Sequence, residues 1–139
     1  MSFEDIPEQR LTPSLAGDGV APSPTPLTQI TRAMVTIYKD QFGRGPRHAH
    51  SHFTGPDAIT CFLEGSLTPV ERTLVEIGEH QRLRDIRMLF QHTAEDTFRS
   101  AVEDITGRKV VAFSSGFDTR ADVATEVFLL ERVAGERSA

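Results

Sequence analysis

The chain has 139 residues, which suffices for one domain with tails, and 25% of them are charged, with a net charge of −5. This acidic balance argues against a broad basic face for nucleic acid, and no apolar run reaches the roughly 20 residues needed to cross a bilayer. The single cysteine, Cys61, excludes an intramolecular disulfide and fits a reducing compartment. We therefore expect a cytoplasmic protein that reaches a membrane only through a partner.

The two ends of the chain differ in composition from its middle. Residues 1–24 are acidic and rich in proline and glycine, and they lack the apolar content that would offset the entropy of ordering them. We expect a disordered tail there, one folded domain over residues 25–133, and a frayed end over residues 134–139.

The first expected element is an amphipathic helix over residues 26–42. Thr25 can cap its first turn, Pro26 fits the first helical position, and Gly43 can end it. Apolar side chains recur every three or four residues, as a helix with one buried face requires: Leu27, Ile30, Met34, Ile37, Tyr38 and Phe42.

Two strands follow, over residues 48–53 and 58–64. In each strand, successive side chains alternate between the two faces. The turn-forming residues 54–57 separate the two strands. So short a connection predicts an antiparallel hairpin.

Two helices come next. The stretch from Thr68 to Glu71 is a capping box with proline at the first helical position, and the short helix that it begins should stop at Gly78. A second helix is expected over residues 80–106, ended by Gly107.

The chain ends in a second pair of strands, over residues 108–114 and 124–133, with a turn at residues 115–118. The complete order is α-β-β-α-α-β-β. Hairpins separated by helices predict an α+β two-layer sandwich, in which helices cover one face of a four-stranded antiparallel sheet.

Four arginines are candidates for binding a small anion. Arg44 and Arg47 flank a glycine- and proline-containing turn, and Arg72 lies in the first turn of the capped helix. Guanidinium groups at such places suit carboxylate, bicarbonate or phosphate. Arg87 falls near the apolar face of its helix, so it either joins this group or has a structural role. That role would be a side chain that extends to solvent, or an ion pair with Glu64, Glu71 or Asp104.

Three histidines alternate along the first strand. His48, His50 and His52 should lie on one face, about 7 Å apart at ~3.3 Å per residue, and neighbours in such a row can share a zinc ion. The competing interpretation is a solvated face of an edge strand that resists pairing with other chains.

No arrangement of residues specifies catalysis, so we expect a protein that is not an enzyme and has no cofactor, unless the histidine row binds zinc. Cys61 lies within an apolar strand and should be buried and inert. The last hairpin carries acids that are interpreted as loop residues, namely Asp118, Asp122 and Glu126. Met88 and Leu89 lie off the apolar row of their helix, and Phe117 lies at the expected turn. These residues indicate a self-association face and hence a homodimer, and the competing interpretation is apolar residues scattered over the surface.

Several stretches resemble the MpsC family, whose small bacterial domains are named for a Na+-translocating membrane-potential-generating system. The resemblance spans about residues 27–131. The matching stretches are Arg32-Ala33-Met34-Val35, Tyr38-Lys39, Phe42-Gly43-Arg44-Gly45-Pro46, Leu63 to Leu74, Val102 to Val110 and Glu126-Val127-Phe128.

The resemblance implies a non-enzymatic accessory or regulatory domain, associated with a membrane system that transports cations or inorganic carbon. A membrane-transport protein would then be its partner. Two alternatives remain open: a small-anion binding protein that uses the four arginines, and a metal-binding protein that uses the histidine row.

Overall fold

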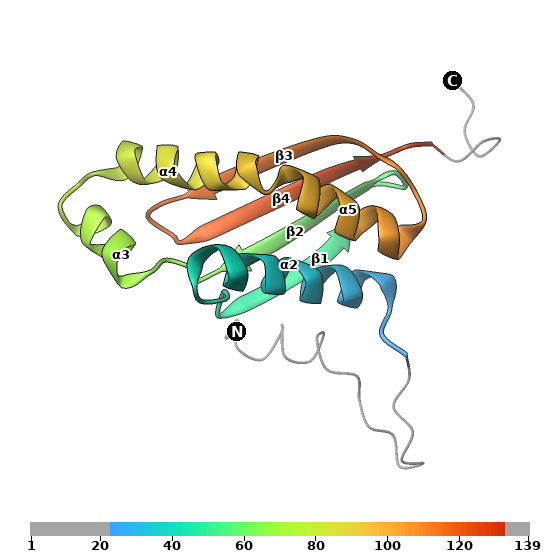
Figure 1. The fold of residues 1–139 in the computed structure, drawn as a ribbon, viewed down its shortest axis with the longest axis horizontal. Coiled ribbons are helices and arrows are strands. Elements are labelled where there is room, and N and C mark those ends of the chain that lie inside the picture. Colours follow the sequence, from blue (N-terminus) through green and yellow to red (C-terminus); the bar gives the residue numbers. More distant parts are fainter. Residues whose placement is uncertain (1–22, 133–139) are drawn as a thin grey trace, which may run out of the picture.

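The computed structural model describes residues 23–132, in which four helices pack against a four-stranded antiparallel sheet (Figure 1). The predicted fold class is confirmed, and so is the element order, except that the last predicted helix is divided into two. The predicted tail, apart from residues 23 and 24, and the predicted frayed end lie outside the described residues. In chain order the elements are α2 (Pro26–Phe42), β1 (His48–Phe53), β2 (Ala58–Glu64), α3 (Pro69–Glu76), α4 (His80–Thr93), α5 (Glu95–Thr106), β3 (Val110–Asp118) and β4 (Val123–Leu130).

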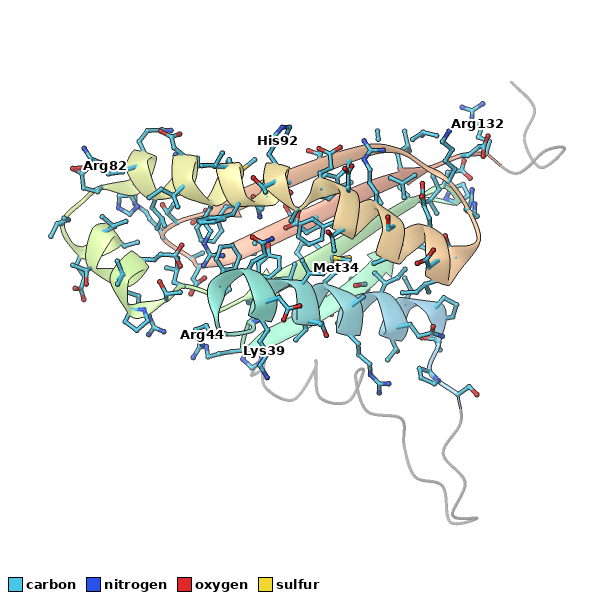
Figure 2. The ribbon with its side chains drawn as sticks, in the orientation of Figure 1. Met34, Lys39, Arg44, Arg82, His92 and Arg132 are labelled. Atoms are coloured by element: carbon cyan, nitrogen blue, oxygen red, sulfur yellow. The ribbon has the colours of Figure 1, made fainter. Side chains whose placement is uncertain are left out.

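Helix α2 forms as its sequence predicts. The hydroxyl of Thr25 accepts a hydrogen bond from the backbone N–H of Thr28, and Gly43 ends the helix in the left-handed region at φ 77°. Met34 points from α2 into the interior, whereas Lys39 lies at the periphery (Figure 2). Met34 and Tyr38 are both completely buried.

The sheet has the strand order β1-β2-β4-β3, so β1 and β3 are its edges. Alternate residues of β2 and β4 are buried and the residues between them are not. The helices therefore cover one face, as Figure 1 shows, and they leave the other face open. The covered face contributes Ile59, Cys61, Leu63, Ala124, Phe128 and Leu130 to the core.

The single long helix predicted over residues 80–106 is wrong. The chain forms two helices, α4 and α5, which meet at Ala94 with φ −90° and ψ 2°. No glycine or proline marks this break, so propensity alone does not reveal it. The change of direction allows α4 to pack on β3 while α5 packs on both β3 and α2 (Figure 1).

The second hairpin also differs from its prediction. Residues 115–118, which were expected to form the turn, continue β3, and the turn lies at residues 119–122. Phe117 is consequently half-buried beside the core instead of standing at a turn. In this longer register Ser115 lies opposite Glu126, so cross-strand pairing with β4 outweighs the turn preference of the local sequence.

Candidate functional site

The loop from Gly65 to Thr68 is bound to the turn between β3 and β4 through Asp122. The backbone carbonyl of Asp122 accepts a hydrogen bond from the N–H of Gly65 at 2.9 Å. The carboxylate of Asp122 accepts from the N–H groups of Ser66 and Leu67 at 3.0 and 3.2 Å. Asp122 has φ 56°, a left-handed conformation that aspartate tolerates better than most residues. These contacts hold the β2–α3 loop and the β3–β4 turn at one end of the sheet.

Three arginines line a pocket of about 310 Å³ at this end of the sheet. Arg47 precedes β1, Arg72 lies in the first turn of α3, and Arg120 lies in the β3–β4 turn. We call this space the arginine pocket. The other residues that line it are Gly65, Leu67, Val75, Glu76, Thr119 and Asp122.

The backbone of Gly65 provides the surface on which Arg47 lies. A Cβ atom at Gly65, where φ is +73°, would stand only 2.5 Å from Nε of Arg47. Glycine is therefore required here both for its conformation and for the close approach of the guanidinium group.

The four predicted anion-binding arginines occupy different surroundings. Arg47 and Arg72 line the arginine pocket. Arg44 does not line it but lies beside it, because the guanidinium groups of Arg44 and Arg72 both donate to the carbonyl of Leu67, at 2.7 and 3.3 Å. Arg87 is completely buried and points elsewhere.

Arg87 forms an ion pair with Glu71, one of the structural partners considered from the sequence. Its Nε and Nη2 donate to the two carboxylate oxygens, each at 2.6 Å, and its guanidinium carbon lies 3.8 Å from the ring centre of Phe42. Burial acts to raise the pKa of Glu71, but hydrogen bonds from Arg87 and Thr68 outweigh it and leave this pKa below its ordinary value.

A second buried cluster surrounds Glu126. Its side chain accepts hydrogen bonds from the hydroxyl of Tyr38 at 2.5 Å, the amide of Gln91 at 2.9 Å and the hydroxyl of Ser115. Burial raises the pKa of Glu126 to about 7, against the opposing effect of these three donors. Burial of Glu126 in the core thus favours the protonated form of its carboxyl more than exposure to solvent would.

The interpretation of Glu126 as a loop acid is wrong. It lies in the middle of β4, in phase with the buried residues Ala124 and Phe128. The alternation along residues 124–130 was the available signal, because a period of two places Glu126 on the same face as Phe128. Arg120 was also missed, and only the strand order brings it beside Arg47.

The histidine row lies on edge strand β1, as predicted. Nδ1 of His50 lies 2.6 Å from Nε2 of His52, and Nε2 of His50 lies 3.5 Å from a carboxylate oxygen of Glu64. Within residues 23–132, no three His, Cys, Asp or Glu side chains are arranged to hold a metal ion. Metal binding by His48, His50 and His52 stays a prediction, which elemental analysis of untagged protein tests.

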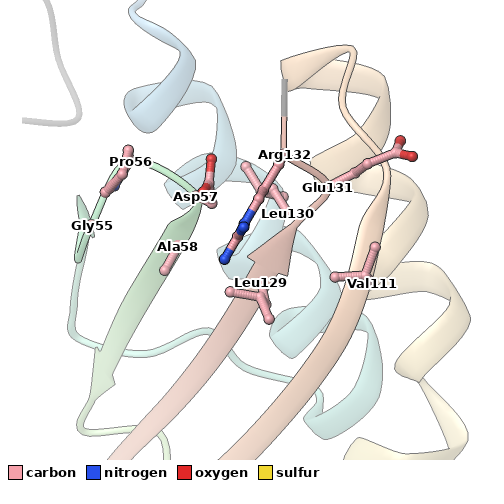
Figure 3. Close-up of a pocket in the computed structure, with 9 residues that line it drawn as sticks. All are labelled: Gly55, Pro56, Asp57, Ala58, Val111, Leu129, Leu130, Glu131 and Arg132. Carbon is pink, nitrogen blue, oxygen red and sulfur yellow. The ribbon is translucent and has the colours of Figure 1, made fainter. Parts of the chain in front are cut away.

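A wider pocket, of about 560 Å³, lies at the other end of the sheet, between the β1–β2 turn and the end of β4 (Figure 3). Asp57 is the buried acid at its wall, and its carboxylate accepts a hydrogen bond from Arg108 at 2.7 Å. The same guanidinium group donates to the carbonyls of Pro56 and Glu131. Asp57 and Arg108 thus join the end of β4 to the β1–β2 turn, a structural role.

The fold and these sites define a small α+β domain in which the described helices cover one face of the sheet and arginines gather at one end of it. The chain belongs to the MpsC family: the family model, described as Na+-translocating membrane potential-generating system (MpsC), matches residues 27–132. Searches of curated proteins and of solved structures each gave no match. None of the helices described within residues 23–132 has the length and apolar character needed to span a bilayer.

Proposed function

We propose that this chain is a non-enzymatic accessory subunit of a Na+-translocating membrane system, and that it acts in the cytoplasm by binding a protein of that system. The observation that carries the proposal is the family match, which extends from the first turn of α2 to the residues just after β4.

The buried polar side chains bind one another, which supports a function of this chain other than catalysis. Arg87 and Glu71 bind each other, and Glu126 binds Tyr38, Gln91 and Ser115. Groups bound in this way stabilise the packing of helices on the sheet, and the partner protein would be met at the surface instead.

Exposed apolar side chains concentrate on α3, on α4 and in the turn between them. Val70, Ile77 and Leu89 are the most exposed of them, with 74%, 66% and 63% of their surfaces accessible. Large apolar side chains exposed on adjacent helices are typical of a surface that binds another protein. In a homodimer, the same side chains would contact the second copy of the chain. We define the α3–α4 surface as Val70, Ile77, Ile86, Met88, Leu89 and Phe90.

Affinity purification from detergent-solubilised membranes of the source organism tests the proposal. The wild-type chain should recover a membrane-transport protein, and Leu89→Asp should lose it because a carboxylate would be buried at the contact. Ser100→Asp is the matched control, since it adds the same charge at an exposed position on α5.

Three results would contradict the accessory role. They are recovery of no membrane protein with the wild-type chain, equal recovery with Leu89→Asp, and unchanged Na+-dependent membrane potential in cells that lack the gene. Sedimentation equilibrium of the wild-type chain tests the homodimer separately, because it gives the mass of the assembly in solution.

The arginine pocket favours a second candidate, a small-anion binding protein. Arg47 and Arg72, both proposed from the sequence, line one pocket with Arg120. Isothermal titration calorimetry with phosphate, bicarbonate and sulfate tests this function, and the absence of heat with all three would exclude it.

A further inference from the structure

The arginine pocket presents three hydrogen-bond donating groups from three separate segments of the chain. Within the described residues, Arg47, Arg72 and Arg120 form no salt bridge, so their charges are not neutralised by a carboxylate in direct contact. The guanidinium group of Arg72 donates a hydrogen bond to the carbonyl of Leu67. The side chain of Arg47 lies close against the backbone of Gly65. These contacts restrict two of the three guanidinium groups before an anion binds, which lowers the entropy cost of binding.

The same pocket also contains two hydrogen-bond acceptors, Glu76 and Asp122. Oδ2 of Asp122 accepts from the N–H of Leu67, which leaves room for a second donor. Glu76 lies on the exposed side of α3 at the rim of the pocket. The lining residues alone carry three positive and two negative side chains, a net charge of about +1, and Asp118 adds a negative charge next to Arg120.

This mixture of donors and acceptors distinguishes between anions of similar size. Sulfate offers only acceptor oxygens at neutral pH and would be repelled by Glu76 and Asp122. Inorganic phosphate keeps at least one proton at neutral pH, so it offers acceptor oxygens to the guanidinium groups and a P–OH donor to a carboxylate.

We infer that the arginine pocket binds inorganic phosphate and selects it through its remaining proton. Arg47, Arg72 and Arg120 bind the phosphate oxygens, and Asp122 or Glu76 accepts the P–OH hydrogen. The inference rests on the small-anion-binding function proposed above and names its ligand.

Isothermal titration calorimetry at neutral pH and constant ionic strength tests the inference, with inorganic phosphate and sulfate as the two main probes. We expect phosphate to bind at least about tenfold more tightly than sulfate, since sulfate has no proton to donate to the carboxylate and leaves that hydrogen bond unmade. Dimethyl phosphate, a diester without a proton, stands in for a lipid headgroup and should also bind weakly.

Two exposed positions provide variants that keep the fold. Arg120→Ala should weaken phosphate binding by about tenfold or more, because it removes a charge-assisted donor. Glu76→Gln should reduce the preference for phosphate over sulfate, because it removes a carboxylate that repels sulfate. Arg132→Ala is the matched control: this exposed arginine lies at the opposite end of the molecule from Arg44 (Figure 2) and should bind phosphate as the wild type does.

Each unfavourable result has a distinct meaning. Sulfate or dimethyl phosphate binding as tightly as phosphate would overturn selection through the proton. Phosphate binding that is unchanged in Arg120→Ala would overturn the site. Binding of bicarbonate or sulfate without phosphate would overturn the inference and leave the small-anion function standing, whereas no heat with any anion would remove both.

Discussion

Arg87 on α4 and Glu71 on α3 form a two-pronged ion pair in the interior, with two N–H···O distances of 2.6 Å. The same carboxylate accepts from the backbone N–H of Thr68 at 2.9 Å, in the capping box that begins α3. Arg87 also donates to the carbonyl of Ser66 at 2.9 Å. One arginine therefore fixes the start of α3, the loop before it and the position of α4.

We expect Arg87→Met to destabilise the protein by about 3–5 kcal/mol, because it leaves the charge of Glu71 partly buried without its partner. Urea denaturation followed by circular dichroism measures this loss. The double variant Arg87→Met with Glu71→Leu should recover part of the loss, since both charges are then removed.

The control for this prediction is Arg82→Ala, which removes an exposed ion pair between Arg82 on α4 and Glu79, the N-cap residue of that helix. Exposed pairs contribute about 0–1 kcal/mol, so its effect should be small. Equal losses of stability in Arg87→Met and Arg82→Ala would contradict a structural role for the buried pair.

Glu126 should make stability depend on pH. Its folded pKa of about 7 lies above the ordinary value of 4.5, so the folded state favours the protonated carboxyl. The stability that this preference contributes is complete below pH 4.5 and is lost as the pH rises through 7, with a size of up to about 3 kcal/mol.

Glu126→Gln isolates this effect, because the amide does not titrate. Between pH 5 and pH 8 the wild type should lose stability relative to Glu126→Gln, as measured by urea denaturation at each pH. Parallel pH profiles for the two proteins would show that Glu126 has the same pKa in the folded and unfolded states.

Tyr38→Phe should raise the pKa of Glu126 further, because the hydroxyl of Tyr38 donates to the carboxylate and favours its charged form. The loss of a hydrogen bond to a buried group should also destabilise the protein at pH 8 by about 1–3 kcal/mol. A carboxyl titration of labelled glutamate by nuclear magnetic resonance measures the pKa. A lower pKa in the variant would contradict the assigned direction of this hydrogen bond.

Gly65→Ala should lose both stability and phosphate affinity. A left-handed conformation costs a residue with a Cβ atom about 1–2 kcal/mol, and the new methyl group would displace the guanidinium of Arg47. Gly43→Ala is the matched control, since Gly43 has φ +77° with no atom within 4 Å of its Cβ position. It should lose similar stability and keep phosphate affinity, so equal loss of affinity in both variants would contradict the role of Gly65.

Local sequence signals predicted the elements whose boundaries depend on neighbouring residues. Thr25 and Gly43 delimit α2, and the capping box at residues 68–71 begins α3, because caps act over three or four residues. The same signals failed for the break at Ala94 and for the length of β3. At those places packing on the sheet and pairing with β4 outweigh propensity.

The sequence by itself determined the fold class, the α-β-β-α-α-β-β order apart from the division of the last helix, and the family, and it proposed Arg47 and Arg72 as candidate anion ligands. These inferences follow from short-range patterns and residue types. Only the tertiary structure showed that Arg87 lies outside the arginine pocket and that Arg120 lines it. The physical reason is the strand order β1-β2-β4-β3, which pairs Glu64 with Val123 and so brings the β3–β4 turn beside Gly65. A contact between residues so distant along the chain depends on sheet pairing, and no local pattern encodes it.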